Sequence, residues 1–142
     1  MPVLVGFWAF AAMACGKDAA VAGSPFCADG GATFTAIQSA ILTPTCATSS
    51  CHDAVSSATS GGLNLTASAS HAQLVGANAT TTFCTSAANS TRVAAGLTAQ
   101  SCLHLRLTTT TAVERMPRNE GALAADKIDC IRTWIQNGAP NN

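Results

Sequence analysis

The first regular hydrophobic pattern of the chain lies between Ala32 and Leu42. Phe34, Ile37 and Ile41 recur there at the spacing of one helical face. Pro44 follows, and a proline either stops a helix or bends the chain. The pattern predicts a helix that packs one face inward.

The pattern near the C-terminus is the clearest of the chain. Four apolar residues recur at intervals of four, three and four positions, on one helical face: Ala124, Ile128, Ile131 and Ile135. Trp134 lies beside them, and Gly138 and Pro140 follow as stop signals. We predict a helix that ends just before Gly138.

A shorter helix is predicted from Ser68 to Val75, with Ala72 and Val75 facing inward and Gly76 just past its end. Before it, the pair Gly61-Gly62 is a strong turn signal that precedes Leu63-Asn64-Leu65.

Another short helix is predicted from Ala99 to Leu107, before a tract of β-branched threonines at 108–111 that disfavours its continuation. Its apolar positions are Cys102, Leu103 and either Leu105 or Leu107. The stretch 77–98 shows no period, and no alternating run of strand length occurs. The fold is therefore expected to be mainly α.

The first 14 residues form an apolar run of the length of a secretory h-region, too short to span a bilayer. Small residues precede Cys15, which resembles the lipobox of bacterial lipoproteins, where the cysteine becomes the lipidated N-terminus. A buried or interfacial N-terminal helix is the alternative. A Gly/Ala/Ser/Pro stretch follows, so we expect a flexible tether at 15–26 and the folded domain at 27–142.

Composition restricts the function. Only 10% of residues are charged and the net charge is zero, which argues against nucleic-acid binding and against a polybasic membrane surface. Ala, Thr and Ser supply 29, 18 and 12 residues, so the surface consists largely of small side chains. Seven cysteines indicate a protein outside the reducing cytosol. Because seven is odd, disulfides alone cannot account for all of them.

Cys46 to His52 has the sequence C-A-T-S-S-C-H. Two thiols followed directly by an imidazole form the pattern of covalent c-type haem attachment, which usually has two residues between the cysteines. Here the cysteines are five positions apart, about 500° around a regular helix. Residues 47–50 must therefore form a loop if both sulfurs are to reach one macrocycle.

Other interpretations of these residues stay open. Cys46, Cys51 and His52 could form a zinc site with one further cysteine, or the cysteines could form disulfides with His52 as a bystander. Met116, in the sequence Arg-Met-Pro, is a candidate sulfur ligand opposite the histidine, and its alternative role is to fill a gap in the core.

The chain resembles the single-haem cytochrome c domain of bacterial secreted proteins and lipoproteins. Four features carry the resemblance, in this order: an amphipathic helix before the haem site, C-A-T-S-S-C-H, G-G-L-N-L, and R-M-P followed by a helix ending T-W-I-Q-N-G-A-P. They cover nearly all of Ala32 to Pro140. The resemblance implies a bundle of about three to five short helices with long loops around one haem, the last helix crossing the first.

The resemblance also implies roles for individual residues. Cys46 and Cys51 would form the thioethers to one haem c, with His52 as the proximal and Met116 as the distal iron ligand. Further residues are suggested to line or back the haem pocket: Leu63, Leu65, Ile131 and Trp134. His71 and His104 are the alternatives to Met116 as distal ligand.

Four cysteines remain in the domain and allow three pairings: Cys27, Cys84, Cys102 and Cys130. We expect Cys84 to pair with Cys102, which closes the stretch without a period. We expect Cys27 to pair with Cys130, because the chain entering the first helix should lie near the last one.

These features predict an electron carrier, not an enzyme, in the periplasm, outer membrane or cell surface of a bacterium. Its partners would be redox proteins, and a lipidated Cys15 would attach it to a membrane. Two alternatives remain: a ligand-binding or peroxidase-like haem protein with an exchangeable distal site, and a haemless structural lipoprotein stapled by disulfides. Self-assembly of haem domains into a polymer is compatible with the sequence but not indicated by it.

Overall fold

The structure, a computed structural model, describes Cys27 and residues 32–142. The apolar run 1–14, Cys15 and the tether 15–26 lie outside the described residues. Five α-helices and three helical segments of other pitch form the regular structure, and β-pairing in the described chain is limited to isolated bridges. The predicted mainly-α fold is confirmed. Over the same residues, no helix is long and apolar enough to cross a membrane.

Helix α1, Phe34–Ile37, continues directly as the π-helix η1, Gln38–Cys46. The sequence leaves open whether Pro44 stops this helix or bends the chain. The helix does not stop there but continues to Cys46, two residues beyond the proline. In an α-helix the proline ring would clash with the carbonyl four positions back. The wider π turn bonds five positions back, as in the bond from the N–H of Ala47 to the carbonyl of Leu42 at 2.7 Å, and so accommodates the proline.

Helix α2, Ser70–Leu74, lies within the predicted range and ends before Gly76, whose φ is 72°. Of the two residues predicted to face inward, Val75 is partly buried against the core, but the prediction for Ala72 is wrong. Ala72 is exposed, while Ser70 and Leu74 are buried. The reason is a buried polar pair: the hydroxyl of Ser70 donates to Oε1 of Gln38 at 2.5 Å, and a pattern of apolar residues cannot show that contact.

The middle of the chain is more regular than its sequence indicates. After the 3-10 turn η2, Ser56–Thr59, the stretch without a period contains helix α3, Thr82–Ser86. A 3-10 turn, η3, Thr98–Gln100, then precedes helix α4, Cys102–Thr108. The helix predicted from Ala99 therefore starts later, and the threonine tract ends it as expected.

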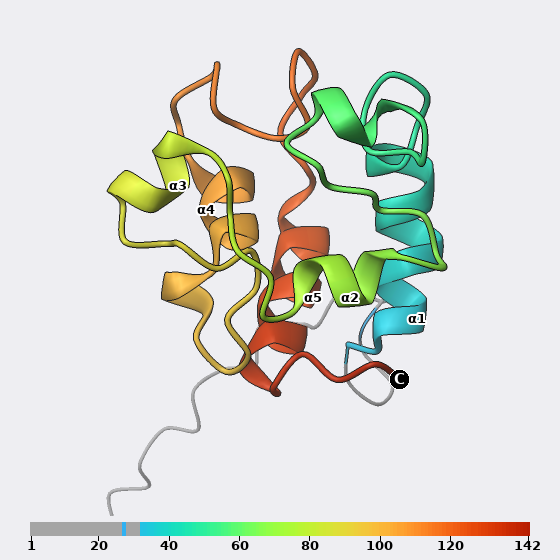
Figure 1. Cartoon of the computed structure of the whole chain (residues 1–142). Coiled ribbons are helices and arrows are strands. Elements are labelled where there is room, and N and C mark those ends of the chain that lie inside the picture. The colour runs from blue at the N-terminus through green and yellow to red at the C-terminus, as the bar shows by residue number, and fades with distance from the viewer. Residues whose placement is uncertain (1–26, 28–31) are drawn as a thin grey trace, which may run out of the picture.

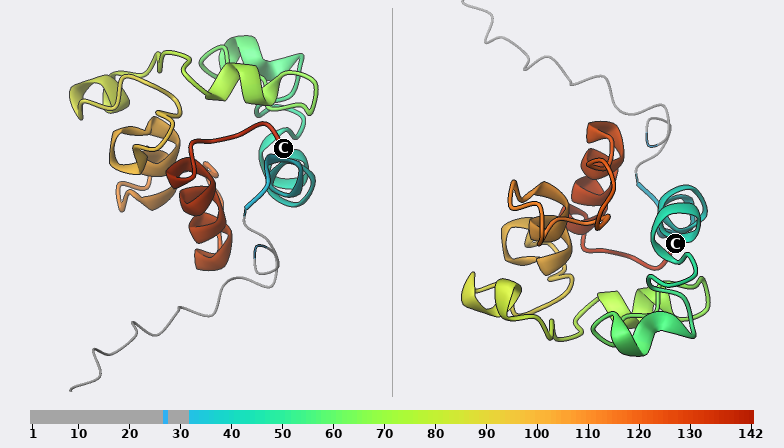
Figure 2. Two further views of the ribbon diagram at one scale, coloured as in Figure 1. Left: turned by 90° about the horizontal axis from the view of Figure 1, so that it is seen from below. Right: turned by 90° about the horizontal axis from the view of Figure 1, so that it is seen from above.

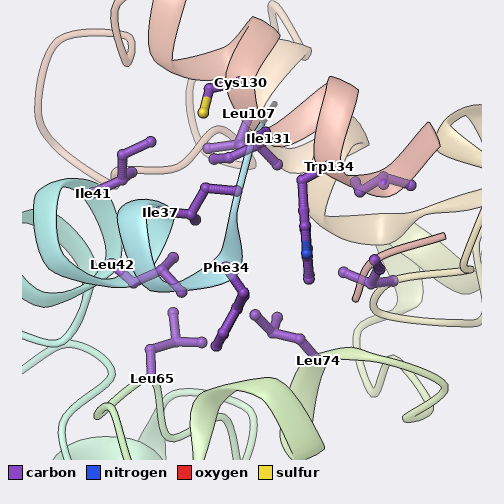
Figure 3. Packing of buried hydrophobic residues seen from close by; sticks show 14 of the residues in the cluster. Phe34, Ile37, Ile41, Leu42, Leu65, Leu74, Leu107, Cys130, Ile131 and Trp134 are labelled. Atoms are coloured by element: carbon purple, nitrogen blue, oxygen red, sulfur yellow. The ribbon is translucent and has the colours of Figure 1, made fainter. Parts of the chain in front are cut away.

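Helix α5, Ala125–Gln136, packs against α1 and forms the centre of the core (Figures 1 and 3). The rings of Phe34 and Trp134 lie 5.2 Å apart between their centroids. The segment after α5 runs back from α5 toward α1 (Figure 2). Two hydrogen bonds hold it: the indole N–H of Trp134 donates to the carbonyl of Pro140 at 2.8 Å, and the N–H of Thr35 donates to the carbonyl of Asn142 at 2.8 Å.

Both predicted disulfides are present. Cys27 is bonded to Cys130 on α5, and Cys84 on α3 is bonded to Cys102 at the start of α4. The free cysteines of the described chain are Cys46, which is partly buried, and Cys51, which is exposed.

Candidate functional site

Cys46 and Cys51 lie on either side of a closed loop. The helix ends at Cys46, and Ser50 then takes a φ of 71°. The N–H of His52 returns to the carbonyl of Cys46 at 3.0 Å. With the usual two-residue spacing, an α-helical bond four positions back would join the same two groups. The loop predicted at 47–50 is therefore confirmed, and it accommodates two extra residues while keeping this closure.

His52 is held by its ring and by its backbone. Its Nδ1 lies 3.1 Å from the carbonyl oxygen of Leu63, and its own carbonyl accepts the N–H of Leu65 at 2.7 Å. When Nδ1 carries the proton and donates to a carbonyl, Nε2 keeps its lone pair, as is usual for a histidine that binds a metal. The segment from Leu63 to Leu65 therefore orients the imidazole.

This segment is fixed at both of its ends. Gly61 and Gly62 precede it with φ values of 69° and 67°, a left-handed conformation that glycine adopts without strain. At its other end, the buried Gln38 donates from Nε2 to the carbonyl of Leu65 at 2.9 Å. The carbonyl that faces His52 is thus placed by a tight turn and by the core.

The surroundings favour the neutral form of His52. Burial lowers the pKa of its imidazole, and the charges of Arg92 and Arg106 lower it further, against the opposite effect of the hydrogen bond to Leu63. The neutral imidazole is the form that binds iron.

The surroundings also keep Cys46 as a thiol. Burial, with contributions from Cys51 and Glu120, raises its pKa to about 11. A zinc site needs thiolates, and it would need a further cysteine. The other four cysteines of the described chain are in disulfides, and no three His, Cys, Asp or Glu side chains there form a metal-binding group. The described residues thus offer no further free cysteine to complete a zinc site with Cys46, Cys51 and His52.

Met116 belongs to the segment between α4 and α5, and Figure 1 shows loops of this segment at the same end of the molecule as the loops that follow η1. Met116 is partly buried and packs against the core. Its N–H donates to the carbonyl of Arg106 at 2.9 Å, and Arg106 is also one of the charges that act on His52. Ligation of iron by Met116 stays a prediction.

The apolar residues predicted to line or back the pocket fall into two pairs. Leu63 and Leu65 lie in the segment that holds His52. Ile131 and Trp134 are fully buried, and the Trp134 ring faces Phe34 across the contact between α1 and α5 (Figure 3). A direct part for this second pair in a haem pocket stays a prediction.

The two other histidines lie in different surroundings. Nε2 of His71 lies 3.0 Å from the carbonyl oxygen of Ala139, and its ring packs edge-on against Phe34. His104 lies within the electrostatic influence of Arg132 and Asp129 on α5. His71 would have to break its packing in order to bind iron, and the choice of distal ligand among Met116, His71 and His104 stays a prediction.

The donor set fits a covalently attached haem. Two free thiols flank the loop, the imidazole next to Cys51 has its Nδ1 anchored, and Met116 packs against the same core cluster as Cys46. The Nε of Arg115, beside Met116, is buried without a hydrogen-bond partner in the described chain. A buried guanidinium N–H of this kind suits an anion such as a haem propionate.

Two functional groups carry no signal in the sequence. The carbonyl of Leu63 is a backbone group, and the Gly61-Gly62 turn before it is the nearest sign of its position. The contact of Arg106 with the methionine loop follows only from the fold.

No family model matches the chain, and no curated protein or solved structure matches it either.

Proposed function

We propose that this protein carries one covalently attached haem c on a cytochrome c-like fold and transfers single electrons outside the cytoplasm. One observation carries the proposal. The closed loop from Cys46 to His52 presents two free thiols beside an anchored imidazole, while the other cysteines of the described chain are in disulfides. This combination fits thioether attachment with axial ligation by a histidine.

A bound haem supplies a reversible one-electron couple, and the protein supplies its ligands and surroundings. In this proposal Cys46 and Cys51 would hold the macrocycle, and His52 and Met116 would bind its iron. With two protein ligands the iron would serve one-electron transfer, which favours an electron carrier over an enzyme that binds substrate at the metal. Arg115 would pair with a propionate.

The exposed side chains around this end suit contact with a redox partner. Cys51 is exposed, and so are two large apolar side chains close in sequence to the candidate ligands: Val55, three residues after His52, is 87% exposed, and Val113, three residues before Met116, is 68% exposed. Electron-transfer complexes bury little surface and are short-lived, so small exposed apolar side chains suit such a contact. The two disulfides support a location outside the reducing cytosol.

The test is the intact mass and visible spectrum of the full chain, produced in a host that matures c-type cytochromes. We expect the mass of the chain plus one haem, and a Soret band that stays with the polypeptide after denaturation and acid-acetone extraction. A Cys46→Ala, Cys51→Ala double variant should lose the covalent haem. A His71→Gln variant, which leaves the motif intact, should keep it. A wild-type chain without Soret absorption would refute the proposal.

A further inference from the structure

We infer that Arg106 is the positioning residue for Met116, an inference that rests on the function proposed above. Two parts of Arg106 contact the loop between α4 and α5. Its carbonyl accepts the N–H of Met116 at 2.9 Å. Its guanidinium Nη1 donates to the carbonyl of Glu114 at 2.7 Å and forms an ion pair with the Glu114 carboxylate. Arg106 therefore holds the backbone at Glu114 and at Met116.

These contacts attach the loop to the rest of the protein. The other hydrogen bonds of residues 110–122 are local turns: Glu114 and Arg115 donate to Thr111, Thr111 donates to Thr109, and Arg118 donates to Val113. Between described residues, each hydrogen bond from this stretch to a more distant element ends on Arg106. One side chain and one carbonyl of α4 thus supply the hydrogen bonds that support Met116, in addition to its packing against the core.

Arg106 is itself held in place. Its side chain is only 11% exposed, and its guanidinium carbon lies 5.0 Å from the centroid of the Phe83 ring. Phe83 precedes Cys84, whose disulfide to Cys102 ties α3 to the start of α4. A guanidinium that lies over a ring and is paired with a carboxylate has little freedom left. The support of Met116 therefore extends through α4 to the disulfide.

This support matters because the thioether is a neutral and weak ligand for iron. The apparent affinity of a ligand falls with the fraction of time that its segment is in the binding conformation. Releasing the Glu114 end of the loop lowers that fraction. The iron would then lose the methionine more often, and an external ligand would bind faster.

The test compares variants of the haem-loaded full chain. In Arg106→Ala the carbonyl that accepts the Met116 N–H remains, and only the guanidinium contacts are lost. We expect cyanide to bind the oxidised protein about ten- to a hundredfold faster. The weak far-red absorption band of a methionine–iron(III) bond should fall in parallel. Glu114→Gln, which removes the charge but keeps the carbonyl contact, should show a smaller change in the same direction.

Arg132→Ala is the matched control, because it removes an arginine from an exposed ion pair with Asp129 on α5. It should leave the cyanide rate and the far-red band as in the wild type. A haem-loaded Arg106→Ala protein that matches this control would overturn the inference and leave the proposed function intact. A wild type that carries haem but has no far-red band would show that Met116 does not bind the iron, and would therefore overturn the inference. A haemless wild type would overturn both.

Discussion

The turn before Leu63 gives the sharpest prediction, because one methyl group should change both stability and the haem. Gly62 has a φ of 67°, and a Cβ there would lie 3.9 Å from its nearest neighbour, a guanidinium nitrogen of Arg92. Gly62→Ala is therefore strained by its backbone and not by a clash. Left-handed backbone costs alanine about 1–2 kcal/mol, and the smaller entropy of the unfolded alanine chain offsets about 0.4–1 kcal/mol. The free energy of unfolding should fall by about 1 kcal/mol.

Gly76→Ala is the control for this substitution. Gly76 has a φ of 72° and nothing within 4 Å of its added Cβ, but it follows α2 and does not precede Leu63. Urea titrations followed by circular dichroism should show the same loss of stability in both variants. Only Gly62→Ala should change the reduction potential, because it moves the carbonyl that accepts from Nδ1 of His52.

The expected change is an increase in potential. A hydrogen bond from Nδ1 makes the imidazole a stronger donor, which favours the oxidised iron, so weakening the bond favours the reduced iron. Spectroelectrochemical titration of the two variants measures the difference. Equal potentials in both variants would refute the anchoring of His52 by Leu63, and an undiminished stability of Gly62→Ala would refute the backbone argument.

Three further predictions concern stability and partner binding. Replacing both cysteines of Cys27–Cys130, which are 103 residues apart, should lower the free energy of unfolding by about 4–5 kcal/mol. Replacing those of Cys84–Cys102, 18 residues apart, should lower it by about 3 kcal/mol, and the reverse order in urea titrations would contradict the chain-entropy argument. Burial lowers the pKa of His104 from 6.5, so its contribution to stability is present above that pH and is lost as the pH falls; thermal melts at about pH 7 and pH 5 should show a smaller acid loss in His104→Gln. The zero net charge predicts that reduction by a protein partner changes less than about threefold between low and high salt, and a steep fall in stopped-flow rates would count against it.

The sequence predicts the parts of this fold that depend on apolar spacing. The last helix begins and ends close to where its pattern and Gly138 indicate, and its buried residues include Ile131 and Ile135. The disulfides follow from chain position. Helix α3 is not predictable, because five residues are too few to show a period. The buried face of α2 is not predictable either, because the contact of Ser70 with Gln38 sets it.

The candidate site, too, has one part that residue spacing predicts and another part that it does not. The loop between the cysteines follows from spacing, because no regular helix brings residues 46 and 51 to one edge. The contacts that orient the ligands do not follow from spacing. They join His52 to a backbone carbonyl eleven residues ahead and Met116 to a backbone carbonyl ten residues behind. Backbone carbonyls are the same in every residue, so only the three-dimensional fold selects them.

The two axial candidates are supported by different parts of the molecule. His52 depends on the Leu63–Leu65 segment, and through Gln38 on the packing of η1. Met116 depends on Arg106 in α4, and α4 is tied to α3 by a disulfide. Damage to one support therefore need not reach the other. Loosening α4 should release the Met116 sulfur from iron. His52 and the covalent bonds from Cys46 and Cys51 would still hold the haem. If the protein binds haem as proposed, Met116 is thus the ligand whose bond to iron can change while the cofactor stays attached.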